Sequence, residues 1–152
     1  MAVSGKIISI NVSEETGTKK TPVDSAELVK EFGILGDAHA ELTKEPELKH
    51  RQVSLLATES IKKIFDMGLD VVPGDFAENL TIEGVDISHL PLGTILSFKS
   101  GVALEVTQIG KKCHKRCKIY QTVGDCVMPR EGVFARVLSG GKIIKGDTIN
   151  IV

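Results

Sequence analysis

The sequence predicts a mainly β protein with short helices, an α+β fold arranged as a small barrel. Its second half contains many short apolar segments separated by Gly, Pro or Asp. Two of these segments, Pro91–Ile95 and Ile144–Ile149, share one plan in which a glycine-containing turn precedes an apolar strand. Helical spacing of apolar residues is largely confined to the first half, so the pattern favours a barrel over alternating strands and helices. A chain of 152 residues is expected to form one domain, residues 1–152.

The first elements are a strand and a helix. Residues 6–12 (KIISINV) are rich in branched apolar side chains and predict a strand, and the polar residues 13–22 predict a loop or hairpin tip. The next apolar residues recur at helical spacing and predict a short helix from Asp24 or Ser25 to Phe32, ended by Gly33. These apolar residues are Ala26, Leu28, Val29 and Phe32.

A loop over residues 36–39 and a charged stretch over 41–50 lead into the next pair of elements. Residues 52–56 predict a strand, and residues 58–66 predict a capped helix closed by Met67 and Gly68. The apolar residues expected on one face of this helix are Ile61, Ile64 and Phe65. The remaining predicted strands are residues 79–82, 94–98, 102–109, 133–138 and 148–152. Residues 111–123 interrupt them and have room for a short helix.

The composition excludes several classes of partner. Nineteen basic and twenty acidic residues give a net charge of −1, so the chain as a whole attracts neither nucleic acid nor an anionic membrane surface. The sequence contains neither a secretory signal nor a run of apolar residues long enough to span a membrane, so we expect a cytoplasmic protein. Three cysteines, an odd number, argue against a disulfide framework there.

Reactive chemistry concentrates in residues 111–120 (KKCHKRCKIY), where Cys113 and Cys117 lie among five basic residues and no acid. Neighbouring cations lower the pKa of a thiol because they stabilise the thiolate, which is the nucleophile and the metal ligand. Both cysteines are therefore candidate reactive thiols. The alternative is that they are small core residues and that the lysines form a solvated face. If the stretch is helical, the two thiols face the same side.

Two other sites are compatible with these residue types. One is a structural zinc site with four ligands, Cys113, His114, Cys117 and Cys126. All four lie within fourteen residues, whereas zinc frameworks usually combine two separated pairs. The other is a catalytic pair in which a histidine approaches Cys117 through the fold. The candidates are His39, His50 and His89.

Two glycine-containing loops and four arginines are candidate ligand contacts. The loops are residues 36–39 (GDAH) and 74–79 (GDFAEN), where glycine permits close backbone approach and the polar side chains offer hydrogen bonds. In each loop, the alternative is a turn whose carboxylate bonds its own backbone. Arginine binds phosphate in bidentate fashion, although each one is also compatible with a surface ion pair. The arginines are Arg51, Arg116, Arg130 and Arg136.

Taken in order, these motifs resemble the MOSC domain, the C-terminal domain of molybdenum cofactor sulfurases. The resemblance extends from Lys6 to Val152. The stretches that carry it are residues 36–39 (GDAH), 51–53 (RQV), 74–81 (GDFAENLT), 113–117 (CHKRC), 128–137 (MPREGVFARV) and 146–147 (GD). It implies a small MOSC-type β-barrel that binds the molybdenum cofactor, a pterin dithiolene that carries a phosphate (molybdopterin with its metal).

The resemblance also implies roles for individual residues. Cys117 best matches the family cysteine that carries sulfur or ligates molybdenum, and Cys113 is the second candidate. A thiolate is a soft metal ligand and can carry sulfur as a persulfide. The expected contacts to the small anionic pterin ligand are Gly36, Asp37, His39, Arg51, Glu78, Asn79, Arg116 and Arg136.

Three functions remain open from the sequence. The first is a standalone domain that binds the cofactor for sulfur transfer, insertion or storage, with a cysteine desulfurase or a molybdoenzyme as partner. The second is a molybdenum-dependent reductase of N-hydroxylated compounds with an external electron donor. The third is a zinc-stabilised interaction domain. The chain lacks the pyridoxal-phosphate domain of full sulfurases and the iron–sulfur domain of related reductases, so we expect sulfur or electrons to come from another protein.

Overall fold

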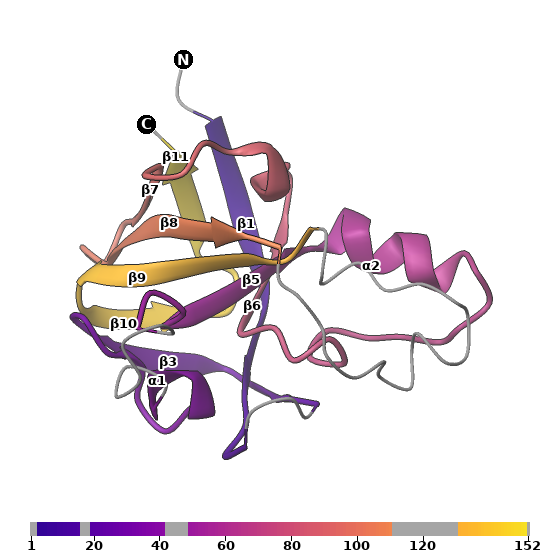
Figure 1. Ribbon diagram of the computed structural model, residues 1–152, viewed down its shortest axis with the longest axis horizontal. Helices are drawn as coiled ribbons and strands as arrows, with labels where there is room; N and C mark the ends of the chain where they lie inside the picture. The colour runs from indigo at the N-terminus through magenta and orange to yellow at the C-terminus, as the bar shows by residue number, and fades with distance from the viewer. Residues whose placement is uncertain (1–2, 16–18, 42–48, 111–130, 152) are drawn as a thin grey trace.

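The computed structural model describes residues 3–15, 19–41, 49–110 and 131–151. Within these ranges, seven strands form a closed barrel in the order β11-β7-β8-β9-β5-β6-β1, because β1 also pairs with β11 (Figure 1). The strands are β1 (Val3–Val12), β5 (Val53–Ala57), β6 (Leu80–Glu83), β7 (Ile95–Phe98), β8 (Ala103–Ile109), β9 (Val133–Ser139) and β11 (Thr148–Ile151). The predicted mainly β barrel is confirmed.

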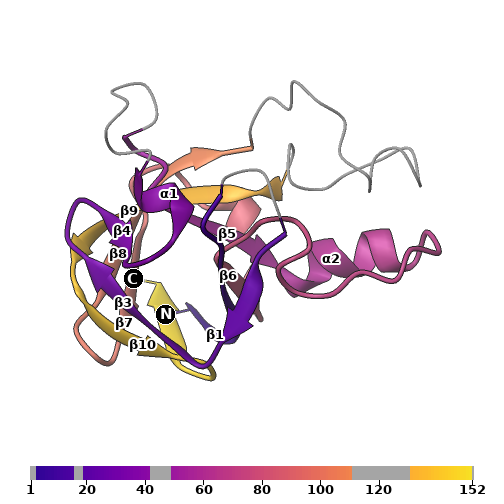
Figure 2. The same ribbon diagram turned by 90° about the horizontal axis from the view of Figure 1, so that it is seen from below.

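A second, smaller sheet lies against the barrel. It has three strands in the order β10-β3-β4, and they are β10 (Gly141–Ile144), β3 (Ser25–Val29) and β4 (Gly33–Ile34). The short helix α1 (Ala38–Glu41) follows β4, and Figure 2 shows it on a different side of the barrel from α2. The strand β2 (Thr21–Val23) pairs antiparallel with the end of β1. Of the two predictions for residues 13–22, a loop or a hairpin tip, this agrees with the hairpin, although Thr21 and Pro22 belong to the strand.

Alternate side chains of the barrel strands fill its interior. Leu104 and Val106 of β8 lie opposite Val137 and Ala135 of β9, and none of the four is more than 1% exposed. Each fully buried Val or Leu stabilises the fold by about 1.5–3 kcal/mol relative to an exposed one. A period of two in burial is typical of a strand with one face toward a core.

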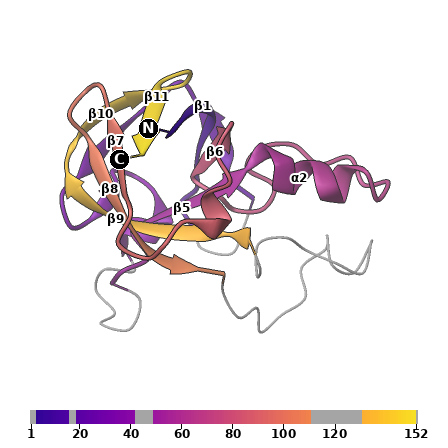
Figure 3. The same ribbon diagram turned by 90° about the horizontal axis from the view of Figure 1, so that it is seen from above.

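The helix α2 (Thr58–Phe65) lies outside the barrel and connects β5 to β6, the only parallel pair among the described strands (Figure 3). A parallel pair needs such a crossover. Ile61 and Ile64 are buried in a cluster with Leu56 and Phe134, which are outward-facing residues of β5 and β9. This cluster fixes α2 against the outer face of the barrel.

Two details of α2 differ from the prediction. Phe65 was expected on the buried face but is 52% exposed, since it ends the helix and lies about 100° around the axis from Ile64. The predicted cap is also wrong, because the N-cap residue is Ala57, which makes no side-chain cap hydrogen bond.

The predicted helix over residues 24–32 is wrong, since residues 25–29 form β3. Ala26 and Leu28 are buried while Glu27 and Val29 are exposed, an alternation that a strand produces. Pairing decides the outcome: Ala26 lies opposite Ile143 of β10, a strand that the sequence did not reveal. Tertiary pairing here overrides the helical spacing of four apolar residues.

The other predicted strands agree with the structure to within a few residues. Elements that the sequence reading missed are all short: β2, β4, β10, α1 and the 3₁₀ turn η3 (Ile87–His89). The helix expected within residues 111–123 lies outside the described residues. None of the described helices has the length and apolar character needed to cross a lipid bilayer.

Candidate functional site

A buried ion pair connects the GDAH loop to the loop that follows β1. Lys20 Nζ lies 2.8 Å from Asp37 Oδ1, and the two side chains are 1% and 0% exposed. The same carboxylate oxygen accepts a hydrogen bond from the Ser13 amide at 3.0 Å, and Lys20 also donates to Ser13 Oγ at 2.9 Å. Burial alone raises the pKa of Asp37, but the hydrogen bond and charge of Lys20 outweigh it and hold that pKa below its ordinary value.

Glu78 organises the GDFAEN loop from within. Its Oε1 accepts hydrogen bonds from the amides of Gly74 at 3.0 Å and Phe76 at 3.3 Å, and its Oε2 accepts one from Thr81 Oγ1 at 2.9 Å. The residue is 0% exposed, and this burial raises the pKa of its carboxyl despite the three donors. Glu78 therefore serves as an internal template for the turn.

Asn79 joins three strands and the ion pair. Its Oδ1 accepts from the Ser54 amide at 3.0 Å, and its Nδ2 donates to the Asn11 carbonyl at 3.0 Å. Its side chain also hydrogen-bonds Asp37. The structure thus brings together three predicted contacts, Asp37, Glu78 and Asn79, in what we call the buried polar network. Its other members are Asn11, Ser13, Lys20, Ser54 and Thr81.

A second group of polar residues lies at the end of β8 and is half-buried. Arg51 donates from Nε to Gln108 Oε1 at 3.1 Å, and its guanidinium carbon lies 5.3 Å from the centre of the Phe134 ring. His50 Nε2 lies 2.6 Å from the same Gln108 oxygen. We call His50, Arg51, Gln108 and Phe134 the Arg51 cluster. Within the described ranges, the two terminal nitrogens of Arg51 make no hydrogen bond. The guanidinium is therefore positioned by Phe134 and Gln108 while its terminal N–H groups are available to bind a ligand.

The Arg51 cluster adjoins both ends of the segment that carries the cysteines. Gln108 Nε2 donates to the Gly110 carbonyl at 2.7 Å, and the Gly110 amide donates to the Gly132 carbonyl at 2.6 Å. Residues 111–130 therefore begin and end at neighbouring points of β8 and β9. Three predicted site residues in that segment, Cys113, Arg116 and Cys117, lie outside the described residues, as do His114, Cys126 and Arg130.

The remaining predicted contacts lie elsewhere. Arg136 of β9 bonds Glu105 through Nε and lies 3.4 Å from Glu31 Oε1 through Nη1, so two acids match its charge. Gly36 is exposed with φ +88° in the turn before α1. His39 belongs to α1, and its side chain is outside the described set.

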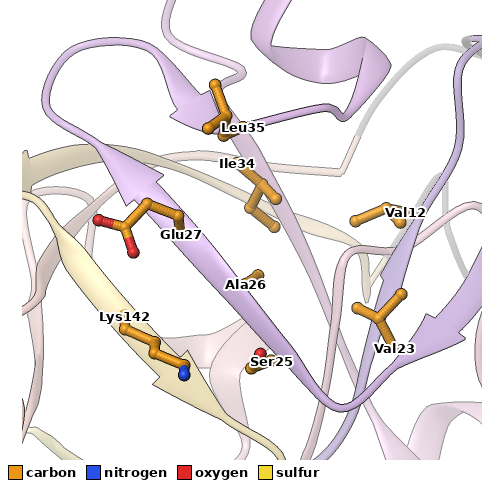
Figure 4. A pocket seen from close by; sticks show the side chains of 8 residues that line it. All are labelled: Val12, Val23, Ser25, Ala26, Glu27, Ile34, Leu35 and Lys142. Atoms are coloured by element: carbon orange, nitrogen blue, oxygen red, sulfur yellow. The ribbon is translucent and has the colours of Figure 1, made fainter.

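Neither of two surface hollows is lined by those predicted ligand contacts whose side chains the structure describes. One of about 770 Å³ lies beside the first turn of α2 and includes Glu131, which follows the cysteine segment and bonds Ser60 and Lys63. The other, of about 400 Å³, is open and lies between β3 and the ends of β1 and β2 (Figure 4). Its wall includes Val12, Val23 and Ile34, with Lys142 at one side (Figure 4). In the described ranges, no group of three or more His, Asp or Glu side chains is arranged to hold a metal ion.

The sequence reading missed Lys20 and Gln108. Lys20 is one of two lysines in a polar loop, and nothing in the sequence distinguishes it from Lys19, which is 69% exposed. Gln108 is a polar residue near the end of a strand, a position where solvent exposure is the ordinary expectation. Only the fold places each beside its partner.

Comparison with known proteins places this fold. A family model described as MOSC domain matches residues 31–150. Among solved structures, the YuaD protein of Bacillus subtilis is similar with a TM-score of 0.82 at 20% identity, over 99% of this chain and 97% of that one. The YiiM proteins of Geobacillus stearothermophilus and Escherichia coli have TM-scores of 0.69 and 0.64 at 22% and 19% identity. They cover 97% of this chain in each case, and 75% and 69% of their own chains. No curated protein matches the sequence.

Proposed function

Because this chain belongs to the MOSC domain family, we propose that it binds the molybdenum cofactor, or its molybdopterin precursor, for sulfur transfer, insertion or storage. The observation that carries the proposal is the position of Arg51. Its guanidinium is fixed by Phe134 and Gln108, at the base of the segment that contains the cysteines. Residues 111–118 add five further basic residues at that place in the chain.

The charges of the Arg51 cluster suit the phosphate of such a ligand. A guanidinium binds phosphate through two parallel N–H donors, and the terminal nitrogens of Arg51 have no hydrogen-bond partner among the described residues. Held by an aromatic ring and an amide, the side chain loses little further freedom when it binds. In this proposal Arg116 and Arg136 are secondary contacts, since Arg136 already faces Glu105 and Glu31.

Cys117 is the proposed reactive thiol, with Cys113 as the second candidate. A thiolate is a soft ligand for molybdenum and accepts sulfur as a persulfide, and the surrounding cations favour its ionised form. When bound, the cofactor supplies a dithiolene-held metal centre to which a thiolate can bind. The chain's own contribution is to hold the phosphate end and to present the thiol.

The buried polar network has a supporting part in this proposal. Asp37 and Glu78 direct their carboxylates at internal donors, so we assign them to shaping the loops at residues 36–39 and 74–79. Gly36 and His39 then border the pterin from the first of these loops. Asn79 ties both loops to β1 and β5. The proposed protein partners are a cysteine desulfurase as sulfur donor and a molybdoenzyme as acceptor.

The test is the metal and pterin content of the protein purified without oxygen from cells that make the cofactor. We expect pterin, measured by fluorescence after oxidation, in the native protein and in the control variant Lys142→Met, whose exposed lysine lies on β10. Arg51→Met should retain far less. Absence of pterin and of a Cys117 persulfide from the native protein would refute the proposal. Stoichiometric zinc in their place would support the zinc-stabilised interaction domain.

A further inference from the structure

The side-chain amide of Gln108 has one orientation that satisfies all of its neighbours. Its nitrogen lies 2.7 Å from the Gly110 carbonyl, which can only accept a hydrogen bond. Its oxygen lies 3.1 Å from Arg51 Nε, which can only donate one. Reversing the amide would place two donors together and two acceptors together. The amide oxygen therefore faces both Arg51 and His50.

This orientation fixes the tautomer of His50. The Gln108 oxygen lies 2.6 Å from His50 Nε2, and an amide oxygen has no proton to give, so Nε2 must carry the hydrogen. In the neutral imidazole, Nδ1 is then a bare acceptor. Across the described part of the chain, His50 Nδ1 has no hydrogen-bond partner. Arg51 donors and a histidine acceptor thus project from adjacent residues bonded to the same oxygen atom.

Donors on Arg51 and an acceptor on the preceding residue together match a particular ionic form of phosphate. A phosphate monoester has a second pKa of about 6, so near neutrality part of it carries one P–OH group beside its charged oxygens. In a bound phosphate of this form, the charged oxygens would accept hydrogen bonds from Arg51 and the P–OH would donate one to His50 Nδ1. Sulfate has similar size and shape but carries no proton near neutrality, so it leaves that acceptor unpaired.

We propose that His50 is the specificity-determining residue of this anion site, that it selects a singly protonated phosphate over sulfate, and that Gln108 is the residue that positions it. The inference rests on the proposed function and deepens it, because it names the side chain that recognises the protonated phosphate of the ligand. The same chemistry fits free phosphate and a phosphate monoester. Gln108 itself touches only protein groups, so it acts through His50 and Arg51.

The experiment titrates the full chain with inorganic phosphate, methyl phosphate and sodium sulfate, at a pH where the ¹⁵N spectrum shows neutral His50. We expect the native protein to bind singly protonated phosphate, counted by its own concentration at that pH, about tenfold more tightly than sulfate, the ratio that corresponds to one additional hydrogen bond. His50→Phe should reduce this ratio to near one and leave sulfate affinity unchanged. Arg51→Met should weaken both anions, and His89→Phe, at an 82% exposed side chain, should change neither.

Gln108→Leu tests the positioning role. It should lower the phosphate-to-sulfate ratio although residue 108 does not touch the anion, and it should move the ¹⁵N signals of both His50 ring nitrogens. In the native protein those signals should show a protonated Nε2 and an unprotonated Nδ1. Methyl phosphate that binds as tightly as inorganic phosphate assigns the site to monoesters, whereas much weaker binding assigns it to free phosphate.

Three results would overturn the inference: a protonated Nδ1 in neutral His50, an unchanged ratio in His50→Phe, or no binding of either phosphate probe. These outcomes are separate from failure of the proposed function. If the protein prefers phosphate to sulfate as expected but never contains pterin, the phosphate site stands and the proposed function fails. If His50→Phe retains pterin and keeps the native phosphate-to-sulfate affinity ratio, the proposed function stands and the inference about His50 fails.

Discussion

Lys20 and Asp37 form an ion pair inside the protein, with 2.8 Å between Nζ and Oδ1 and at most 1% of either side chain exposed. Seventeen positions separate them in the chain. Because each charge would be costly to bury alone, the pair holds the GDAH loop against the loop after β1. The position of a predicted ligand-binding loop therefore depends on a lysine outside every motif.

Replacing Lys20 with methionine should destabilise the protein by about 3–5 kcal/mol, because it leaves the Asp37 carboxylate buried without its counter-charge. Denaturant unfolding measures the change. The matched control is Lys19→Met, since Lys19 is 69% exposed and lies 3.9 Å from Asp75; its effect should stay below about 0.5 kcal/mol. The double variant Lys20→Met/Asp37→Leu should be more stable than Lys20→Met alone. Equal effects of the two lysine variants would contradict this account.

Glu78 should make stability depend on pH above its ordinary pKa of 4.5. Its pKa is raised above the ordinary value of 4.5, so the folded protein holds the proton more tightly than the unfolded chain. The stabilisation that comes from this tighter proton binding is fully present below pH 4.5, and it is lost as pH rises through the folded-state pKa of Glu78. The free energy of unfolding falls by about 1.4 kcal/mol for each pH unit that separates the folded and unfolded pKa values. Glu78→Gln cannot titrate, so its free energy of unfolding should fall less between pH 4.5 and neutrality.

Two observations make the pH experiment specific to Glu78. Glu83→Gln, at an exposed position of β6, should keep the native profile. Asp37 acts in a different window, because its pKa is lowered: its contribution is present above its ordinary value of 3.8 and is lost as pH falls through the folded-state pKa. Parallel profiles for Glu78→Gln and the native protein would show that burial does not set the protonation of Glu78.

Gly74 should tolerate no side chain. A Cβ there would lie 2.4 Å from the Lys20 carbonyl oxygen, and φ is +96°. Gly93 has φ of +90° but nothing within 4 Å of its Cβ position, so Gly93→Ala isolates the backbone cost, about 1–2 kcal/mol. Gly74→Ala should cost at least about 3 kcal/mol, because backbone on one side must move. Similar melting temperatures for the two variants would place the loops at residues 20 and 74 further apart than described.

Cys117→Ser should abolish pterin retention and persulfide formation while leaving the melting temperature unchanged, since the proposal gives this thiol chemistry and no structural role. Cys126→Ser is the matched control and should affect neither. Mass spectrometry of the cysteine peptides and pterin fluorescence measure the two properties. Equal loss in both variants would remove Cys117 from the proposal, and loss confined to Cys113→Ser would transfer the role to that residue.

The sequence revealed those elements whose pattern is local. Residues 103–107 of one such strand alternate in burial, and the glycines and prolines between the strands mark the turns. Residues 25–29 escaped because Ala26 and Val29 also have helical spacing, and only the pairing of Ala26 with Ile143, more than a hundred residues away, selects the strand. A pattern of only five residues cannot distinguish the period of a strand from the period of a helix.

Three residues that the sequence singled out lie together in the structure, but their arrangement was not predictable. Asp37, Glu78 and Asn79 do come together, yet their carboxylates and amide bond protein groups that no spacing rule connects to them. Asn79 reaches Ser54 and Asn11, which are 25 and 68 positions away. Likewise, of Arg51 and Arg136, the two predicted arginine contacts that the structure describes, Arg51 keeps spare donors because the fold places Arg136 beside two acids.

The pairing of Val3 with Ile151 bears on how the protein is made. Among the barrel strands, β1 precedes its partner β6 by about eighty residues, but its other edge pairs with β11, the barrel strand that follows all the others in the sequence. Until β11 is made, β1 and β7 each have an edge with unpaired backbone N–H and C=O groups, which can pair with a strand of another chain. The nascent barrel thus stays open between β1 and β7 until β11 has been made and pairs with both strands.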